Sequence, residues 1–281
     1  MSHPSMAPGR VAVVTGAAGG IGRAASNYYA SQGMKVCMAD IDEERLSVCA
    51  EEVAQNAKGG ADDVLMMPTD SGRREDILAF KDAVFDRFGE VGVLMNNAAF
   101  GIGGSASALD DFVGWQRSLD VTMWGVINGT QAFVPTMIAQ GTSCAVVNTS
   151  SKQGITLPPG NTPYNVGKAA VKAYTELLQH ELRNIEGCQV TAHMLVPGWT
   201  TRAGGEKRPG QWTPDQVVVR LVGAIERGEF YVICPDNDVS SEMDSKRILW
   251  SAGDIAYNRP PLSRWQGDYD DAFEKFDPPL R

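Results

Sequence analysis

The stretch "VAVVTGAAGGIG", residues 11–22, joins a short apolar run to a loop rich in glycine. Residues 11–15 are apolar and mostly β-branched, and the run is too short for a buried helix, so it is typical of a buried strand. Glycines at positions 16, 20 and 22 give the spacing G-x-x-x-G-x-G, and a helix-like segment follows over residues 22–33. Because glycine lets the backbone approach closely and a helix N-terminus favours negative charge, this unit predicts a binding site for the pyrophosphate of a dinucleotide.

The second predicted strand, residues 35–40, ends in Asp40. An acidic side chain at this place can hydrogen-bond both ribose hydroxyls of NAD and repels the 2′-phosphate of NADP. No arginine or lysine follows Gly16 within the glycine loop to favour NADP. NAD is therefore the predicted cofactor, with a merely solvated aspartate as the simpler alternative for Asp40.

Five more strand-like runs alternate with helix-like segments along the chain. The predicted strands are residues 64–68, 91–97, 145–150, 189–197 and 230–234, and the predicted helices are residues 43–56, 73–88, 110–139, 163–184 and 214–227. This alternation implies right-handed crossovers and a mostly parallel sheet that is covered on both faces. We predict an α/β fold: a Rossmann-type, doubly wound sheet of about seven strands in a single domain.

The composition supports one folded domain and argues against several kinds of partner. The chain has 281 residues, 43% of them hydrophobic, and a formal net charge of −9. A negative balance disfavours nucleic acid and anionic membranes as partners. Five cysteines are scattered and three histidines form no evident metal set, which predicts reduced thiols, a cytoplasmic location and no metal. No apolar run approaches the length of about 18 residues that a membrane span needs.

The two ends of the chain differ from its centre. Residues 1–9 are small and polar and are expected to form a flexible N-terminal tail. Residues 10–235 hold all the predicted strands and form the nucleotide-binding domain. Residues 236–281 are polar and carry aromatic residues that include Tyr257, Trp265, Tyr269 and Phe273, so we expect an extension that packs on the domain or on a neighbouring subunit.

The segment "YNVGK", residues 164–168, places a tyrosine and a lysine four residues apart in a predicted helix. Side chains at this spacing share one helix face. A free phenol has a pKa near ~10 and is a poor base at neutral pH, but a nearby positive charge lowers that pKa. Tyr164 and Lys168 are thus candidates for an acid–base pair, although each alone is more often a packing or surface residue.

Six motifs in order resemble the short-chain dehydrogenase/reductase family. They are the glycine loop from Thr15 to Gly22, Asp70 after the third strand, "NNAA" at 96–99, "NTSS" at 148–151, "YNVGK" at 164–168 and "PG" at 197–198. The resemblance covers about residues 11–201. It implies reversible hydride transfer between NAD and a secondary alcohol or ketone.

The resemblance also assigns catalytic roles. Tyr164 would be the general acid/base, and Lys168 would lower the pKa of Tyr164 and hold the nicotinamide ribose. Ser151, 13 residues before Tyr164, would stabilise charge on the substrate oxygen, and its spacing favours it over Ser150. The family usually has asparagine where this chain has Thr122 in "VTMWG"; we hypothesise that Thr122 keeps the proton relay, the alternative being a structural bond within its helix.

The remaining residues implied by the resemblance line the cofactor. Asp70 would approach the adenine, and Asn97 to Ala99 would follow the ribose and pyrophosphate. The full predicted set is Gly16, Ala18, Gly20, Ile21, Gly22, Asp40, Ile41, Asp70, Ser71, Asn97, Ala98, Ala99, Tyr164, Lys168, Pro197, Gly198 and Thr200.

The sequence gives fewer indications of the substrate and of the oligomeric state than of the cofactor. Residues 199–212 are rich in glycine and are expected to form a mobile lid, with Trp199 and residues 156–163 as apolar walls. We expect an uncharged, hydrophobic or aromatic substrate and, from the family, a homodimer or homotetramer. Two alternatives stay open: an NAD-binding sensor or scaffold with weak catalysis, and an epimerase or dehydratase that recycles NAD.

Overall fold

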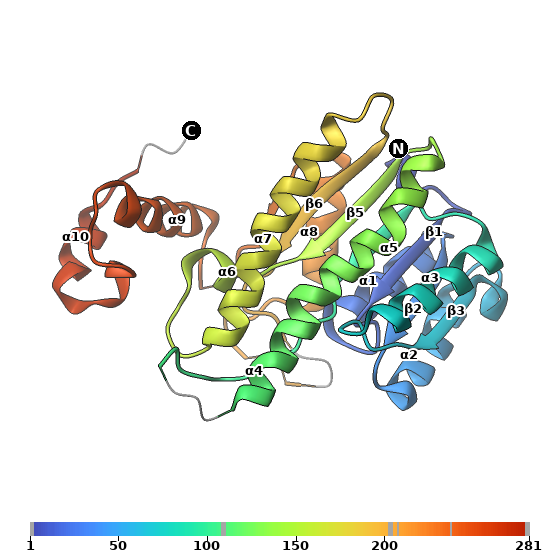
Figure 1. Ribbon diagram of the computed structural model, residues 1–281, viewed down its shortest axis with the longest axis horizontal. Helices are drawn as coiled ribbons and strands as arrows, with labels where there is room; N and C mark the ends of the chain where they lie inside the picture. The colour runs from blue at the N-terminus through green and yellow to red at the C-terminus, as the bar shows by residue number, and fades with distance from the viewer. Residues whose placement is uncertain (1–2, 108–110, 202–204, 207, 237, 279–281) are drawn as a thin grey trace.

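The computed structural model describes residues 3–107, 111–201, 205–206, 208–236 and 238–278 (Figure 1). Its centre is one parallel sheet with the strand order β3-β2-β1-β4-β5-β6-β7. The strands are β1 (Val11–Thr15), β2 (Lys35–Asp40), β3 (Val64–Pro68), β4 (Val93–Asn96), β5 (Cys144–Thr149), β6 (Val190–Val196) and β7 (Tyr231–Ile233). The predicted doubly wound sheet of seven parallel strands is confirmed.

Helices cover both faces of this sheet. One face packs against α1 (Gly20–Ser31), α2 (Glu43–Asn56) and α8 (Pro214–Glu226). The other packs against α3 (Arg74–Phe88), α5 (Gly125–Ala139) and α7 (Thr162–Arg183). Figure 1 shows α5 and α7 crossing in front of β5 and β6, with α4 (Phe112–Leu119) at the lower end of α5.

Two hydrophobic cores result from the alternation of side chains along each buried strand. In β1, Ala12 and Val14 join the core beneath α1 and α8. Val11 and Val13 point the other way and join the core beneath α3, α5 and α7. All four side chains are at most 1% exposed, which explains why the strand reads as a continuous apolar run in the sequence.

The helix predicted over residues 110–139 contains an irregularity. A π-helical segment, Asp120–Trp124, separates α4 from α5, and its residues Val121 and Thr122 are buried. A π-helical turn inserts an extra residue into the helix and is frequent at functional sites. Here it places Thr122 in contact with Phe100, in the loop that follows β4. Residue 110 of the predicted helix lies outside the described residues.

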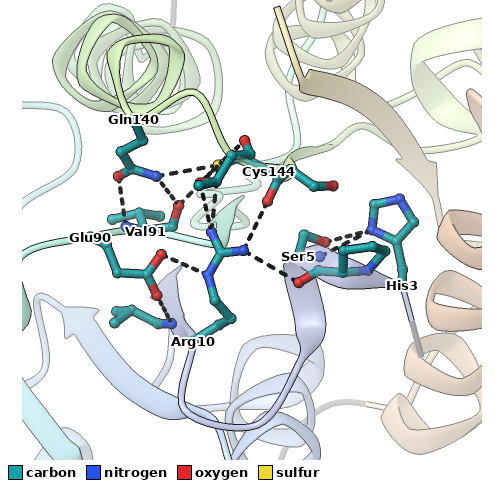
Figure 2. A network of polar contacts seen from close by, with 11 residues as sticks. His3, Ser5, Arg10, Glu90, Val91, Gln140 and Cys144 are labelled. Atoms are coloured by element: carbon teal, nitrogen blue, oxygen red, sulfur yellow. Dashed lines mark hydrogen bonds and ion pairs between the residues drawn. The ribbon is translucent and has the colours of Figure 1, made fainter. Parts of the chain in front are cut away.

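The start of the chain differs from the loose tail that the sequence suggested. Residues Pro4–Met6 form a 3-10 helix, and Ser5 and Met6 are buried. Figure 2 shows Arg10 at the centre of a polar network, donating from Nε to Glu90 Oε2 (2.7 Å) and from Nη1 to the carbonyl of Pro4 (3.3 Å). The segment is packed because these bonds tie it to the amino-terminal edge of the sheet, the edge opposite the predicted site.

The C-terminal extension, residues 236–278 as described, forms helices that lie to one side of the sheet (Figure 1). Its elements are α9 (Ser241–Ala256), α10 (Asp270–Lys275) and two 3-10 turns, Ser263–Trp265 and Gly267–Tyr269. Trp250 is 3% exposed and packs edge-on against Phe273 and Phe276, with centroid distances of 5.4 and 5.3 Å. The extension therefore has a small aromatic core of its own.

No helix in the described parts of the chain is long and apolar enough to cross a membrane.

Candidate active site

The carboxyl-terminal edge of the sheet opens into a cavity of about 1750 Å³. Ser151 reaches this cavity from the end of β5, and Tyr164 and Lys168 reach it from the first turns of α7. Pro163 near the start of α7 fixes a helical φ without needing a backbone hydrogen bond there. Residues far apart in sequence thus meet because parallel strands end on the same side of the sheet.

Lys168 is buried beside Tyr164. Its Nζ atom lies 5.5 Å from the centroid of the Tyr164 ring and donates a 2.6 Å hydrogen bond to the carbonyl of Thr149. The residue is 1% exposed, and burial lowers the pKa of Lys168 from 10.5 to about 7. The charge of this side chain therefore changes in the neutral pH range.

Tyr164 does not have the lowered pKa that the sequence predicted. In the protein alone, burial raises the pKa of the Tyr164 phenol, and a hydrogen bond with Ser151 opposes that rise. Desolvation outweighs this hydrogen bond because a buried phenolate loses its water. Tyr164 is thus held as a neutral phenol, the form that can donate a proton to a carbonyl oxygen.

The two adjacent serines have different surroundings. Ser150 is 1% exposed, and its hydroxyl donates to the carbonyl of Lys168 (2.9 Å). Both serines line the cavity, and the Ser151 Oγ accepts the backbone N–H of Gln153 (3.2 Å). The Ser150 hydroxyl is bonded to the backbone of α7, whereas Ser151 forms a hydrogen bond with Tyr164.

The glycine loop fits a closely approaching dinucleotide. Gly16 has φ +67°, and a Cβ there would lie 2.9 Å from Cα of Ala98. Asn97 locks the loop from the next strand, because its Nδ2 donates to the carbonyl of Thr15 (3.2 Å). Gly20 and Gly22 begin α1, whose free N–H groups face the same edge of the sheet. The loop and its neighbours could therefore hold the pyrophosphate of NAD or NADP.

A second cavity of about 260 Å³ adjoins the loop on the β2 side. Asp40 accepts the N–H of Ala18 at Oδ2 (3.0 Å) and that of Asp42 at Oδ1 (3.1 Å). Arg45, in the first turn of α2, also lines this cavity. The remaining lining residues are Gly16, Ala18, Gly19, Asn97, Ala98 and Ala99.

Sequence reasoning considered only the glycine loop for basic residues and so missed Arg45. The spacing of Asp42 and Arg45 in the sequence was a signal for the position of Arg45. In the structure, Asp42 caps α2 by accepting the N–H of Arg45 (3.1 Å). A capping aspartate three residues before an arginine fixes that arginine in the first helical turn.

Five predicted cofactor contacts do not line either cavity: Gly20 and Gly22 at the start of α1, and Ile41, Asp70 and Ser71. Asp70 is paired with Arg117, whose Nη1 lies 3.0 and 2.8 Å from its two carboxylate oxygens. Ser71 is buried against α5, where it would meet a Cβ placed on Gly125. Ile41 is 62% exposed beside the smaller cavity's Asp40. The ion pair with Arg117 holds the Asp70 carboxylate, and its contact with the adenine stays a prediction.

Thr122 is likewise absent from the cavity walls. Its hydroxyl accepts the N–H of Phe100 (3.1 Å) and donates to the carbonyl of the same residue (3.2 Å). Since a hydroxyl has only one proton, that proton is already used. Thr122 therefore holds the Phe100 backbone, which differs both from a direct relay and from a bond within its own helix.

The segment after β6 borders the larger cavity. Pro197, Gly198, Trp199 and Thr200 line it, and Thr200 Oγ1 donates to the carbonyl of Gly198 (3.2 Å). The expected lid, residues 199–212, is closed on itself by a backbone bond from Trp212 to Trp199 (2.9 Å). Residues 202–204 and 207 of that lid lie outside the described residues.

The cavity wall is more polar than expected. The predicted apolar residues Pro158, Pro159 and Trp199 are present, joined by Phe100 and Ile102. Charged side chains that sequence reasoning missed also line it, namely Lys152, Glu206 and Arg208. The sequence contained a signal for Lys152, because this residue directly follows Ser151.

This geometry defines a class of protein: an α/β fold with a dinucleotide loop beside a Ser–Tyr–Lys constellation. Residues 10–211 match the family model described as short chain dehydrogenase. The chain belongs to the short-chain dehydrogenase family.

The chain is also similar to individual curated proteins. The SadH protein of Mycobacterium tuberculosis is 37% identical over 174 residues, which cover 62% of this chain and 61% of SadH. The chain thus spans less than two thirds of that relative's length.

Two solved structures bear on the cofactor. A short-chain dehydrogenase/reductase of Burkholderia phymatum in complex with NAD is 29% identical, with a TM-score of 0.79, and the match covers 90% of this chain and 96% of that one. A metagenomic short-chain oxidoreductase in complex with NADP is 25% identical, with a TM-score of 0.68, over 82% of this chain and 98% of that one. Both nicotinamide cofactors thus occur among similar proteins.

Proposed function

We propose that this protein transfers a hydride between NAD(H) and an uncharged secondary alcohol or ketone. One observation carries the proposal: Ser151, Tyr164 and Lys168 line a single cavity that also reaches Asn97 and Ile21 at the glycine loop. Isolated residues of these types are common, but their convergence beside a dinucleotide loop is the arrangement that hydride transfer with proton transfer requires.

Each residue has a separate role. The nicotinamide, when bound, supplies or accepts the hydride. Tyr164 donates a proton to the substrate oxygen in reduction and removes it in oxidation. Ser151 hydrogen-bonds the same oxygen and stabilises charge that develops there. Lys168 places a titratable positive charge 5.5 Å from the Tyr164 ring centroid and lies where it could hold the nicotinamide ribose.

The preference for NAD rests on Asp40. Its two carboxylate oxygens each accept one backbone N–H, at 3.0 and 3.1 Å, and each keeps a lone pair for a ribose hydroxyl. A 2′-phosphate at the same position would meet a fixed negative charge. Arg45 is the competing feature, since its cation lines the same small cavity, although its side chain is 59% exposed and 3.8 Å from Asp42.

The charges on the cavity wall support an uncharged substrate. Lys152 is paired with Asp236 and Asp244, at 3.3 and 2.7 Å. Glu206 and Arg208 bring one charge of each sign. No single sign dominates, and Phe100 and Trp199 offer apolar area, which favours a hydrophobic or aromatic substrate.

Assembly and location complete the proposal. Exposed apolar side chains lie on α4, on the π-helical segment before α5 and on α7, namely Phe112, Val113, Trp124, Val166 and Leu177. They support a homodimer or homotetramer that pairs through its long helices. All five cysteines are free, which suits the reducing cytoplasm. The net charge of −9 supports a small-molecule substrate without nucleic acid or membrane partners.

The test is a screen of secondary alcohols and ketones with NAD and NADP in parallel, following NADH or NADPH absorbance. We expect turnover with NAD and a lower kcat/KM with NADP. Binding of NADH without any turnover would contradict the proposal and favour a sensor. Substrate conversion without net NADH formation would favour an epimerase or dehydratase.

A further inference from the structure

Lys152 is the charged residue nearest in sequence to the proposed catalytic serine, and its ammonium group has two buried partners. Its Nζ lies 3.3 Å from Asp236 Oδ2 and 2.7 Å from Asp244 Oδ2. The Lys152 side chain is 17% exposed, and both aspartate side chains are 6% exposed. We call these three residues the Lys152 cluster.

The cluster joins three separate segments at the cavity wall. Lys152 comes from the turn after β5, whereas Asp236 and Asp244 belong to the C-terminal extension, the latter in the first turn of α9. The third segment follows β6, because Asp236 Oδ2 also accepts the backbone N–H of Trp199 (3.2 Å). One carboxylate oxygen therefore links the residue after Ser151 to the base of the expected lid.

Gly198 shows how closely these segments approach. A Cβ on Gly198 would lie 2.6 Å from Asp236 Oδ2 and 3.1 Å from Cε of Lys152. Any other residue would push the ion pair apart. The backbone of Lys152 is also tied to this strand end, since its N–H donates to the carbonyl of Pro197 (3.4 Å).

The charges of the cluster are costly to bury and are not explained by the packing of the extension alone. Burial raises the pKa of the Asp244 carboxyl, and the Lys152 ammonium opposes that rise. Removing one member of a buried ion pair leaves the other without a partner, so the cluster holds its geometry more strictly than an apolar contact would. The extension has an aromatic core of its own around Trp250, which needs none of these charges.

The geometry points to Lys152, Asp236 and Asp244 as positioning residues that fix Ser151 and the Gly198–Trp199 backbone for the reaction, so that the C-terminal extension forms part of the active site. This inference rests on the proposed function. The dinucleotide loop and Asp40 lie on other strands, and within the described residues they share no hydrogen bond or ion pair with the cluster, so loss of the cluster should affect the chemical step more than dinucleotide binding.

The test compares Lys152→Met with Lys152→Arg, and uses Lys81→Met as the matched control. Lys81 pairs with Asp82 on α3 (2.7 Å) and lines neither cavity. We expect kcat to fall on the order of 10–100-fold in Lys152→Met, because small misplacement of a reacting group has effects of that size. The Kd for NADH should change less than about threefold, and Lys152→Arg should recover most of the activity because it keeps the charge.

A second measurement requires no substrate and also covers a poorly folding variant. Hydrogen–deuterium exchange of residues 196–201 should be faster in Lys152→Met, while residues 11–22 should be unchanged. If Lys152→Met does not fold, the double variant Lys152→Met with Asp244→Asn removes one of the two carboxylates that have lost their partner, and it is measured in the same way. Unchanged exchange at 196–201, unchanged kcat, or an equal loss of NADH binding would each overturn the inference. If the wild type turns over no alcohol or ketone, the proposed function fails while the exchange result still decides the role of the cluster.

Discussion

The body of the protein, residues 10–235, and its C-terminal extension, described at residues 236 and 238–278, are stabilised differently. The body buries two apolar cores, one on each face of a seven-stranded sheet. The extension packs a few aromatic rings around Trp250 and joins the body near the cavity through buried charges.

The difference separates two kinds of contribution to a site. The family match ends at residue 211, within the body, and all the residues with proposed chemical roles lie before that point. The extension lies beyond the match, yet two of its carboxylates hold the residue next to Ser151. The proposed chemical roles thus belong to residues of the body, whereas the extension is proposed to help position Ser151.

Tyr164→Phe should abolish most of the activity of the body. Removal of the phenolic hydroxyl takes away the proton donor, so kcat should fall by about 10²–10⁴-fold. The Kd for NADH should stay nearly constant, and steady-state kinetics with fluorescence titration would measure both. Tyr174→Phe, on the same helix, is the control. Retention of wild-type turnover by Tyr164→Phe would remove the acid–base assignment.

Trp250→Ala should unfold the extension and spare the body. Loss of a buried tryptophan costs about 3–5 kcal/mol, more than a small aromatic core can withstand. Hydrogen exchange over residues 241–276 should rise sharply, kcat should fall as in Lys152→Met, and NADH binding should persist. Trp265, which is 44% exposed in the same extension, gives the control variant Trp265→Ala. Full activity with an unfolded extension would show that the body needs no such support.

Asp40→Asn should weaken the discrimination between cofactors without touching the extension. The KM for NAD should rise roughly tenfold, because a charged acceptor for the ribose hydroxyls is lost. The KM for NADP should fall or stay level, since the repulsion of its phosphate is removed and Arg45 remains. Kinetics with both cofactors would measure the ratio, with Asp82→Asn as a surface control. An unchanged NAD/NADP ratio would separate Asp40 from cofactor choice.

Lys168→Met should stabilise the body while it inactivates the enzyme. The folded state releases the Lys168 proton near pH 7, whereas the unfolded chain keeps it until near 10.5. The unfolded state binds more protons between these values, so wild-type stability rises with pH across that window. The variant has no amine to bury, so its free energy of unfolding should exceed that of the wild type by about 1–2 kcal/mol. The gain should be largest at or below pH 7 and smallest near pH 10.5.

Urea unfolding at several pH values would measure this gain. Lys172→Met, one turn further along α7 and 37% exposed at its side chain, should change stability by less than about 0.5 kcal/mol. A variant of Lys168 that is less stable than wild type at pH 6 would contradict the assigned cost of burial.

Activity should follow the same titration. Ketone reduction needs a protonated Tyr164, and a charged Lys168 stabilises the phenolate that forms. Because Lys168 loses its charge as the pH rises through about 7, kcat/KM for reduction should decline above that pH. A flat profile from pH 6 to 9 would indicate that the bound cofactor overrides this effect.

Much of the body could be predicted from the sequence because its signals are local. Apolar runs and glycine spacing gave strands 11–15, 35–40 and 64–68 with the observed bounds, and residues 43–56 form the predicted helix. The motif spacing identified the Ser151, Tyr164 and Lys168 constellation, since each motif sits at a strand or helix end. The helix α9 was not predicted, because its mean polarity resembles that of a surface tail.

The contacts between segments could not be read in this way. Nothing near Asp70 indicates that Arg117 will bind it, and nothing near Thr122 indicates the Phe100 backbone. The direction of the Tyr164 pKa shift was also beyond local reasoning, because it depends on how much water the folded cavity excludes.

Periodicity and motif spacing act over a few residues, and they were enough to predict the alternation of strands and helices, the glycine loop and the residue types of the proposed catalytic set. Packing of the whole chain fixes the strand order, the burial that lowers the pKa of Lys168 to about 7, and the pairing of Lys152 with Asp236 and Asp244 across 84 and 92 positions of the chain. Those features depend on desolvation and on the meeting of distant segments, which exist only once the chain has packed.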